Sequence, residues 1–200
     1  MFEYLNCRIP KRIEEDLEHV SAVMVPLLKK TDGYHILFEV RSKKLNRQPG
    51  EICFPGGRVE PGETPKEAAL RETQEELLIE SKDLKLYGAL DYFLSPAQAR
   101  IEPFLGELTN YHGQFSEAEV DSVFTVPLQF FLETPPDIYY NHVMIEPSKN
   151  FPFSDIPGGT NYPWATGRYE VCFYRYQGHV IWGMTAKILS NNLKYLTKEL

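Results

Sequence analysis

The stretch FPGGRVEPGETPKEAALRETQEELLI, which runs from Phe54 to Ile79, places six glutamates within 26 residues. It opens with a Pro-Gly-Gly turn, and the helix that follows has a clearly marked start. Thr64 is suited to the N-cap position, Pro65 to the first helical position and Glu67 to the third position of a capping box. The stretch therefore predicts a turn followed by an acidic helix that continues to about residue 77 or 78. The six glutamates are Glu60, Glu63, Glu67, Glu72, Glu75 and Glu76.

The later glutamates of this helix are expected to project together from one face. At about 100° per residue, Glu72, Glu75 and Glu76 share a side, and the opposite side would dock on a sheet through Leu70, Thr73 and Leu77. Like charges one turn apart destabilise a helix by about 0.2–0.5 kcal/mol, so three together favour a compensating cation. Carboxylate oxygens are the ligands that Mg²⁺ and Mn²⁺ prefer. The alternative is an ordinary solvated acidic face.

The bulk composition bounds the class of protein. A chain of 200 residues with 42% apolar residues is expected to form one domain with a substantial core. The net charge of −7 argues against a nucleic-acid partner, because phosphates are met by a positive surface. The sequence contains no run of about 18 apolar residues, so it predicts no membrane span. The N-terminus lacks an apolar signal core, and Cys7, Cys53 and Cys172 have the odd, wide spacing of reduced thiols, so we expect a cytoplasmic protein.

The hydrophobic patterns predict an α/β fold, in which helices cover both sides of a mixed sheet. Residues 1–19 form an N-terminal extension with a short helix over 10–19, and residues 147–168 are expected to form an ordered loop or lid, because they are rich in Pro, Gly and aromatic residues. A closing helix is expected over 185–196. Strands are expected over residues 20–28, 34–41, 52–54, 84–94, 100–108, 119–128, 169–176 and 179–184.

Six residues of the opening stretch have the spacing G-x5-E-x7-R-E-x2-E-E, namely Gly57, Glu63, Arg71, Glu72, Glu75 and Glu76. This stretch resembles the Nudix box, and the chain is similar to Nudix hydrolases here. The resemblance implies a Nudix-type α/β/α sandwich whose loop–helix–loop holds divalent cations against a diphosphate. Glu72, Glu75 and Glu76 would then be metal ligands, together with the backbone carbonyl of Gly57. Glu63 and Arg71 would orient these ligands for catalysis.

Two positions depart from the box. Thr73 stands where the family has an apolar residue, which is a mild change because its methyl group can still pack. Leu78 stands where the family has a glycine that ends the helix in a left-handed conformation. Because leucine resists that conformation, we expect the helix to continue for another residue.

The segment RSKKLNRQPGEICFPGG, residues 41–57, carries the substrate information. It follows the pattern R-S-x2-L-x2-H-x-G-x3-F-P-G-G, except that Gln48 replaces the histidine. This pattern resembles the coenzyme A pyrophosphatase branch of the Nudix family, as do residues 119–128 and 181–189. Residues 41–58 carry a local net charge of +4, which suits a ligand with a diphosphate and a 3′-phosphate. Taken alone, Lys43 and Lys44 are better explained as solvated loop residues. The implied substrate-binding residues are Arg41, Ser42, Arg47, Gln48, Gly50 and Arg58.

The reaction that the resemblance implies is metal-dependent hydrolysis of coenzyme A, or of a derivative, to 3′,5′-ADP and 4′-phosphopantetheine or its acyl form, with Mg²⁺ or Mn²⁺. Glu76 and Glu119 are the candidates for the general base. Glu119 is favoured, and a solvated loop position is its alternative. Two other functions stay open: a Nudix pyrophosphatase for ADP-ribose or a dinucleotide, and a Nudix-fold nucleotide sensor without catalysis. The expected partner is a small molecule, and a homodimer stays open beside a monomer.

Overall fold

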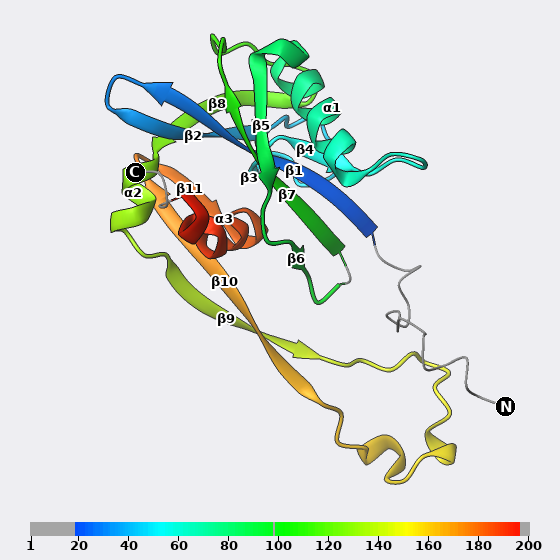
Figure 1. Ribbon diagram of the computed structural model, residues 1–200. Helices are drawn as coiled ribbons and strands as arrows, with labels where there is room; N and C mark the ends of the chain where they lie inside the picture. The colour runs from blue at the N-terminus through cyan, green and yellow to red at the C-terminus, as the bar shows by residue number, and fades with distance from the viewer. Residues whose placement is uncertain (1–18, 98, 197–200) are drawn as a thin grey trace, which may run out of the picture.

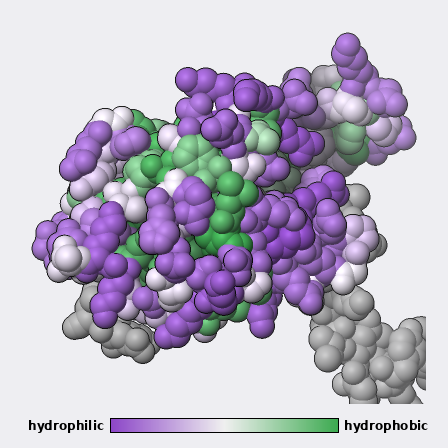
Figure 2. Space-filling model, turned by 90° about the horizontal axis from the view of Figure 1, so that it is seen from above, coloured by the Kyte–Doolittle hydropathy of each residue, from purple (hydrophilic) through white to green (hydrophobic). Residues whose placement is uncertain are grey.

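The computed structural model describes residues 19–97 and 99–196. The helix expected over residues 10–19 and the thiol of Cys7 therefore lie outside the described residues, apart from His19. Among the described residues, no helix combines the length and the apolar character needed to cross a membrane. The surface seen from above is largely hydrophilic and is interrupted by a band of apolar side chains (Figure 2).

The larger sheet has eight strands, and its main order is β3-β2-β1-β7-β5. Strand β4 pairs with β1, β6 with β7, and β8 with β2. The central pair β1–β7 is parallel and the other pairs are antiparallel, so the expected mixed sheet is confirmed. The strands are β1 His19–Lys30, β2 Gly33–Arg41, β3 Ile52–Cys53, β4 Gly56–Arg58, β5 Leu84–Ala89, β6 Phe93–Leu94, β7 Ala99–Leu108 and β8 Val120–Pro127.

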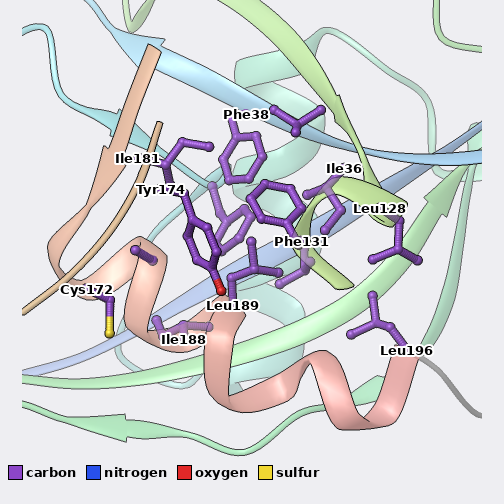
Figure 3. Packing of buried hydrophobic residues seen from close by; sticks show 14 of the residues in the cluster. Ile36, Phe38, Leu128, Phe131, Cys172, Tyr174, Ile181, Ile188, Leu189 and Leu196 are labelled. Carbon is purple, nitrogen blue, oxygen red and sulfur yellow. The ribbon is translucent and has the colours of Figure 1, made fainter. Parts of the chain in front are cut away.

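Side-chain alternation along the central strands divides the core into two clusters. Ala22 and Met24 of β1 pack with helix α1, Pro65–Leu77, on one face of the sheet. Val25 and Leu27 point to the other face, which is covered by α2, Leu128–Glu133, and α3, Gly183–Leu196. On that face Phe38 meets Phe131, Tyr174 and Ile181 in a continuous apolar cluster (Figure 3). The expected α/β/α arrangement is therefore confirmed (Figure 1).

A smaller antiparallel sheet of order β11-β10-β9 continues the molecule beyond the main sheet. Strands β9, Asp137–Met144, and β10, Thr166–Tyr176, form a long hairpin that extends away from the body (Figure 1). Strand β11 covers His179–Trp182. Residues 147–168 form the tip of this hairpin and the start of β10, with two short 3₁₀ turns at Phe153–Asp155 and Gly159–Asn161.

Several boundaries differ from the expectation. The strand expected over residues 84–94 is broken into β5 and β6, with an irregular register between Leu86 and Gly88. The Pro-Gly-Gly segment is more than a turn, since β4 pairs with β1. The pattern also did not predict α2 or β9. Helix α2 has only six residues, which is too short to show a helical period, and β9 is exposed along nearly its whole length, so it shows no alternation of apolar residues.

The start of α1 is as expected. Thr64 Oγ1 accepts a hydrogen bond from the Glu67 backbone N–H, and the Glu67 carboxylate accepts one from the Thr64 N–H at 2.8 Å. The expected continuation at the other end is wrong, because the helix ends at Leu77 and Leu78 adopts a left-handed conformation with φ 49°. This turn brings Ile79 into the apolar cluster beneath α1, and its burial offsets the cost of the unusual backbone.

Leu78→Gly is expected to stabilise the protein. The left-handed conformation costs an ordinary residue about 1 kcal/mol and costs glycine little, and the Leu78 side chain is 57% exposed, so its removal loses little packing. Thermal unfolding should show a midpoint about 2–4 °C higher. Leu78→Ala is the control, because it removes the side chain and keeps the Cβ strain. An equal gain in both variants would assign the effect to the leucine side chain instead.

Candidate functional site

Three carboxylates from two segments converge beside α1. One oxygen each of Glu72, Glu76 and Glu119 lies within 4.8 Å of the other two. Glu72 and Glu76 are one helical turn apart, so α1 aligns them. Glu119 comes from the turn before β8, and this turn is tied to α1 because the Ser116 N–H donates to the Glu76 carbonyl at 2.8 Å. We call Glu72, Glu76 and Glu119 the carboxylate group.

Burial makes this group electrostatically costly. Glu76 is only 2% exposed, and burial raises the pKa of its carboxyl group above the ordinary value, with Glu39 as the next cause. Burial also raises the pKa of Glu72, although Arg71 opposes the shift. One Glu76 oxygen accepts a hydrogen bond from the Gly56 N–H at 2.8 Å. The site thus concentrates acidic groups where their negative charge is poorly solvated, which favours a bound cation.

Arg71 holds the surrounding carboxylates in place. Its guanidinium donates to both oxygens of Glu63, at 2.9 Å and 3.1 Å, and to Glu72 at 2.9 Å. The paired contact lowers the pKa of Glu63 and keeps that carboxylate ionised. Arg71 and Glu63 therefore form an ion pair that also contacts one member of the carboxylate group, Glu72.

Glu75 does not share the environment of its neighbours, which corrects the expectation that three glutamates of α1 project together. Its side chain is 57% exposed and accepts a hydrogen bond from Arg71 at 3.2 Å. Glu76 lies about 40° around the helix from Glu72 on one side and Glu75 about 60° on the other, so a helix that buries Glu76 leaves Glu75 towards solvent and Arg71. In the described part of the chain, the structure groups Glu119 with Glu72 and Glu76 instead.

A fourth carboxyl group, which the sequence analysis missed, lies behind this site. Glu39 of β2 is 0% exposed. Its Oε1 accepts a hydrogen bond from the Cys53 thiol at 3.2 Å, whereas its Oε2 has no partner among the described residues. Burial is the first cause of its raised pKa, and the charges of Glu119 and Glu72 add to it. The available signal was a single carboxylate within the apolar run ILFEV, on the strand side that faces α1.

The composition of this site fits a hard divalent cation. The donors are carboxylate oxygens, which suit Mg²⁺ and Mn²⁺. Behind this group, the unpartnered oxygen of Glu39 is a buried acceptor that no described side chain satisfies. Glu72, Glu76 and Glu119 would hold such an ion, and Gly57 lies beside the Glu72 carboxylate.

Gly57 leaves room for the Glu72 carboxylate. It lies in β4, opposite Ala22 of β1, and a Cβ added there would come within 2.3 Å of Glu72 Oε1. Any larger residue at this position therefore displaces a member of the carboxylate group. The glycine at position 57 is therefore explained by the space that the Glu72 carboxylate occupies, and not by a special backbone conformation.

Gly57→Ala is expected to weaken the apparent affinity for Mg²⁺ about tenfold, because the displaced Glu72 loses its alignment. Calorimetric titration of the metal-free protein with Mg²⁺ measures this change. Gly167→Ala is the matched control, since a Cβ at that position meets only Val143 at an ordinary 3.7 Å. Unchanged Mg²⁺ affinity in Gly57→Ala would mean that Glu72 does not contribute to cation binding.

A cavity of about 530 Å³ joins the carboxylate group to the basic segment of residues 41–58. Four of the six substrate-binding candidates line it, namely Arg41, Arg47, Gln48 and Arg58. Gln48 has a left-handed backbone and donates to the Glu51 carboxylate at 3.0 Å. Negative and positive side chains thus line one space, and this combination suits a phosphorylated ligand bound together with a cation.

Ser42 and Gly50 are not among the residues that line this cavity. Ser42 is buried, and its N–H donates to the carbonyl of Glu119 at 2.7 Å. Gly50 has φ 75° and its N–H donates to the carbonyl of Arg41 at 3.0 Å. Both residues therefore shape the backbone that carries Arg41 and Glu119.

A further wall of the cavity comes from the smaller sheet and from α3. It includes Asn141, Tyr169, Val171 and Trp182. Asn141 was missed because β9 was not predicted, and its polar side chain gave no separate signal. None of residues 147–165 lines the cavity. Tyr162 and Trp164 instead pack on each other, with ring centroids 4.9 Å apart.

Comparison with known proteins agrees with this geometry. The family model described as the NUDIX domain matches residues 18–139. The peroxisomal coenzyme A diphosphatase of Mus musculus is 36% identical over 148 residues, which are 70% of this chain and 62% of that protein. This chain thus spans less than two thirds of that relative.

Two further relatives are matched over more of their length. The mitochondrial coenzyme A diphosphatase of Homo sapiens is 29% identical over 181 residues, which are 88% of this chain and 69% of that protein. An uncharacterized Nudix hydrolase of Citrobacter koseri is 30% identical over 175 residues, 84% of this chain and 78% of that protein. The similarity to these two proteins therefore extends well beyond the segment that carries the carboxylate group.

Proposed function

Since the chain belongs to the NUDIX family, we propose that it is a metal-dependent pyrophosphatase that hydrolyses the diphosphate of coenzyme A or of its acyl derivatives. Water is added across one phosphoanhydride bond, and the products are 3′,5′-ADP and 4′-phosphopantetheine or its acyl form. The names of the mouse and human relatives support this substrate class.

The observation that carries the proposal is the shared cavity. It places the carboxylate group and three arginines, Arg41, Arg47 and Arg58, around one space. Coenzyme A needs both kinds of contact, because its diphosphate is bound best through cations and its 3′-phosphate through guanidinium groups. A substrate without the 3′-phosphate leaves part of the basic wall without a partner.

Each residue has a distinct role in this proposal. Glu72, Glu76 and Glu119, with the Gly57 carbonyl, would hold Mg²⁺ or Mn²⁺, and Arg71 with Glu63 keeps Glu72 oriented. A divalent cation there supplies Lewis acidity, which activates water and neutralises charge on the phosphates. Glu119 also remains the candidate general base, since its carboxylate faces the cavity. Glu75 contributes through its contact with Arg71.

Arg41, Arg47 and Arg58 bind the phosphates, and Gln48 contacts the substrate at the place where the similar family pattern has histidine. Ser42 and Gly50 hold the loop in shape. The substrate is a small molecule, and no nucleic acid takes part. The protein is acidic, with a net charge of −7, and we propose that it acts in the cytoplasm.

Product analysis tests the proposal. Purified protein is incubated with coenzyme A, ADP-ribose or a diadenosine polyphosphate, each with Mg²⁺, with Mn²⁺ and with a chelator. We expect 3′,5′-ADP and 4′-phosphopantetheine from coenzyme A, only when a cation is present. Faster cleavage of ADP-ribose would overturn the substrate. Tight binding of coenzyme A without any cleavage would favour a nucleotide sensor.

A further inference from the structure

A second cavity of about 500 Å³ adjoins the candidate site, and Tyr169 lines both spaces. It lies between the turn that carries β6, the middle of the β9–β10 hairpin and α3. Its lining includes Phe93, Leu94, Pro96, Tyr140, Arg168 and Lys187. Its size is within the range of pockets that bury small ligands, about 300–1,000 Å³.

The walls of this second cavity are mainly aromatic and aliphatic. Phe93 lies against Tyr169, with ring centroids 6.4 Å apart. The Arg168 guanidinium lies over the ring of Tyr140, 6.0 Å from its centroid, and Lys187 is ion-paired with Glu170. One of the two cations is thus neutralised, and the other lies over an aromatic face. These walls suit an uncharged chain better than another phosphate.

The position of the second cavity relative to the charged residues indicates which end of a ligand reaches it. A diphosphate held at the carboxylate group has two substituents that diverge from it. The nucleotide half carries the 3′-phosphate and matches the arginines of residues 41–58. The other half then faces the wall that includes Val171, Trp182 and Tyr169, and Tyr169 also lines the second cavity.

We propose that the second cavity receives the sulfur end of the substrate and that an acyl chain joined to that sulfur is buried there. This inference rests on the proposed function, and it adds a preference for acyl thioesters over the free thiol. Each methylene buried in an apolar site improves binding by up to about fourfold. The value of kcat/KM is therefore expected to rise with acyl length until the cavity is full.

Substitution of Leu94 tests this assignment. The residue lines the second cavity and is 40% exposed, so a polar replacement is compatible with folding. Leu94→Asp is expected to lower kcat/KM for the octanoyl thioester of coenzyme A at least tenfold more than it lowers kcat/KM for free coenzyme A. Val180→Asp is the matched control, because Val180 is 41% exposed on β11 and is absent from the lining of both cavities.

The outcomes separate this inference from the function on which it rests. If the wild type cleaves no coenzyme A compound, the proposed function fails and the inference fails with it. The inference alone is overturned if the wild type cleaves coenzyme A compounds and Leu94→Asp keeps the same dependence of kcat/KM on acyl length. It is also overturned if Leu94→Asp lowers kcat/KM equally for all substrates.

A direct measurement covers the case in which Leu94→Asp folds poorly. Leu94→Cys is incubated with the disulfide of coenzyme A, and its thiolate displaces one coenzyme A thiolate to form a mixed disulfide. Peptide mass mapping should place this adduct at position 94 at least tenfold faster than at position 180 in Val180→Cys. Equal rates at the two positions would contradict a sulfur end bound near Leu94.

Discussion

Glu76→Gln is expected to lower kcat for coenzyme A hydrolysis by about 10³-fold. The substitution removes one charge from the carboxylate group and keeps nearly the same shape. The amide oxygen can still accept the hydrogen bond that the Gly56 N–H donates to Glu76, so β4 keeps its position. The loss therefore falls on the chemistry that depends on a bound cation. Initial rates at saturating Mg²⁺ and coenzyme A measure it.

The same variant should be at least as stable as the wild type in the absence of metal. An amide is uncharged, so its burial costs less than burial of a carboxylate that must ionise. Glu75→Gln is the comparison on the same helix, and we expect a loss in kcat no larger than about tenfold, because Glu75 lies outside the carboxylate group. Equal losses in the two variants would restore Glu75 as a metal ligand and contradict the grouping seen here.

The second large effect is on stability. Without divalent cations, the free energy of unfolding is expected to fall as pH rises above the ordinary glutamate pKa of 4.5. Burial raises the pKa values of Glu39, Glu72 and Glu76 in the folded protein. A raised folded pKa means that the folded state holds a proton that the unfolded state has lost. The contribution of this bound proton to the free energy of unfolding is complete below pH 4.5 and is lost as pH rises through the folded pKa.

Groups with lowered pKa values do not mask this trend. The pKa values of Glu63 and Asp91 are lowered by their partners Arg71 and Lys194, so their contribution is already complete above about pH 5. The net loss between pH 5 and pH 9 is on the order of a few kcal/mol. Mg²⁺ should reverse it, by about 2.7 kcal/mol at a concentration 100 times its dissociation constant.

Urea unfolding at several pH values, with chelator and with Mg²⁺, measures this linkage. With chelator, the free energy of unfolding of Glu76→Gln should depend less on pH than that of the wild type, because one of the buried acids is gone. Glu133→Gln, at an exposed position of α2, is the control and should keep the wild-type slope. A metal-free protein whose stability is constant from pH 5 to pH 9 would show that these acids titrate normally.

Local chemistry made part of this site predictable. Thr64, Pro65 and Glu67 predicted the start of α1 because a capping box depends only on neighbouring residues. The spacing from Gly57 to Glu76 likewise indicated the loop and helix that carry the site. The basic segment also reaches the cavity as expected, through Arg41, Arg47, Gln48 and Arg58.

Tertiary packing decided the rest. The burial of Glu39 and Glu76 depends on how β2 faces α1, which no local pattern contains. Glu119 joins the carboxylate group through a turn tied to α1 by hydrogen bonds. Leu78 takes the conformation of a glycine because the next residue, Ile79, is drawn into the core. In each case a contact distant in sequence outweighed the local preference.

The pairing of β4 with β1 has a consequence for how this protein could diversify. The Pro55 carbonyl and the Val59 N–H are hydrogen-bonded to β1, and residues 56–58 between them pair with β1. This side of the site is therefore held in place by a central strand of the protein. The wall that holds Tyr169 belongs to the smaller sheet and is built separately. Natural variation could therefore remodel the choice of substrate on the hairpin side while the chemistry beside β1 stays intact.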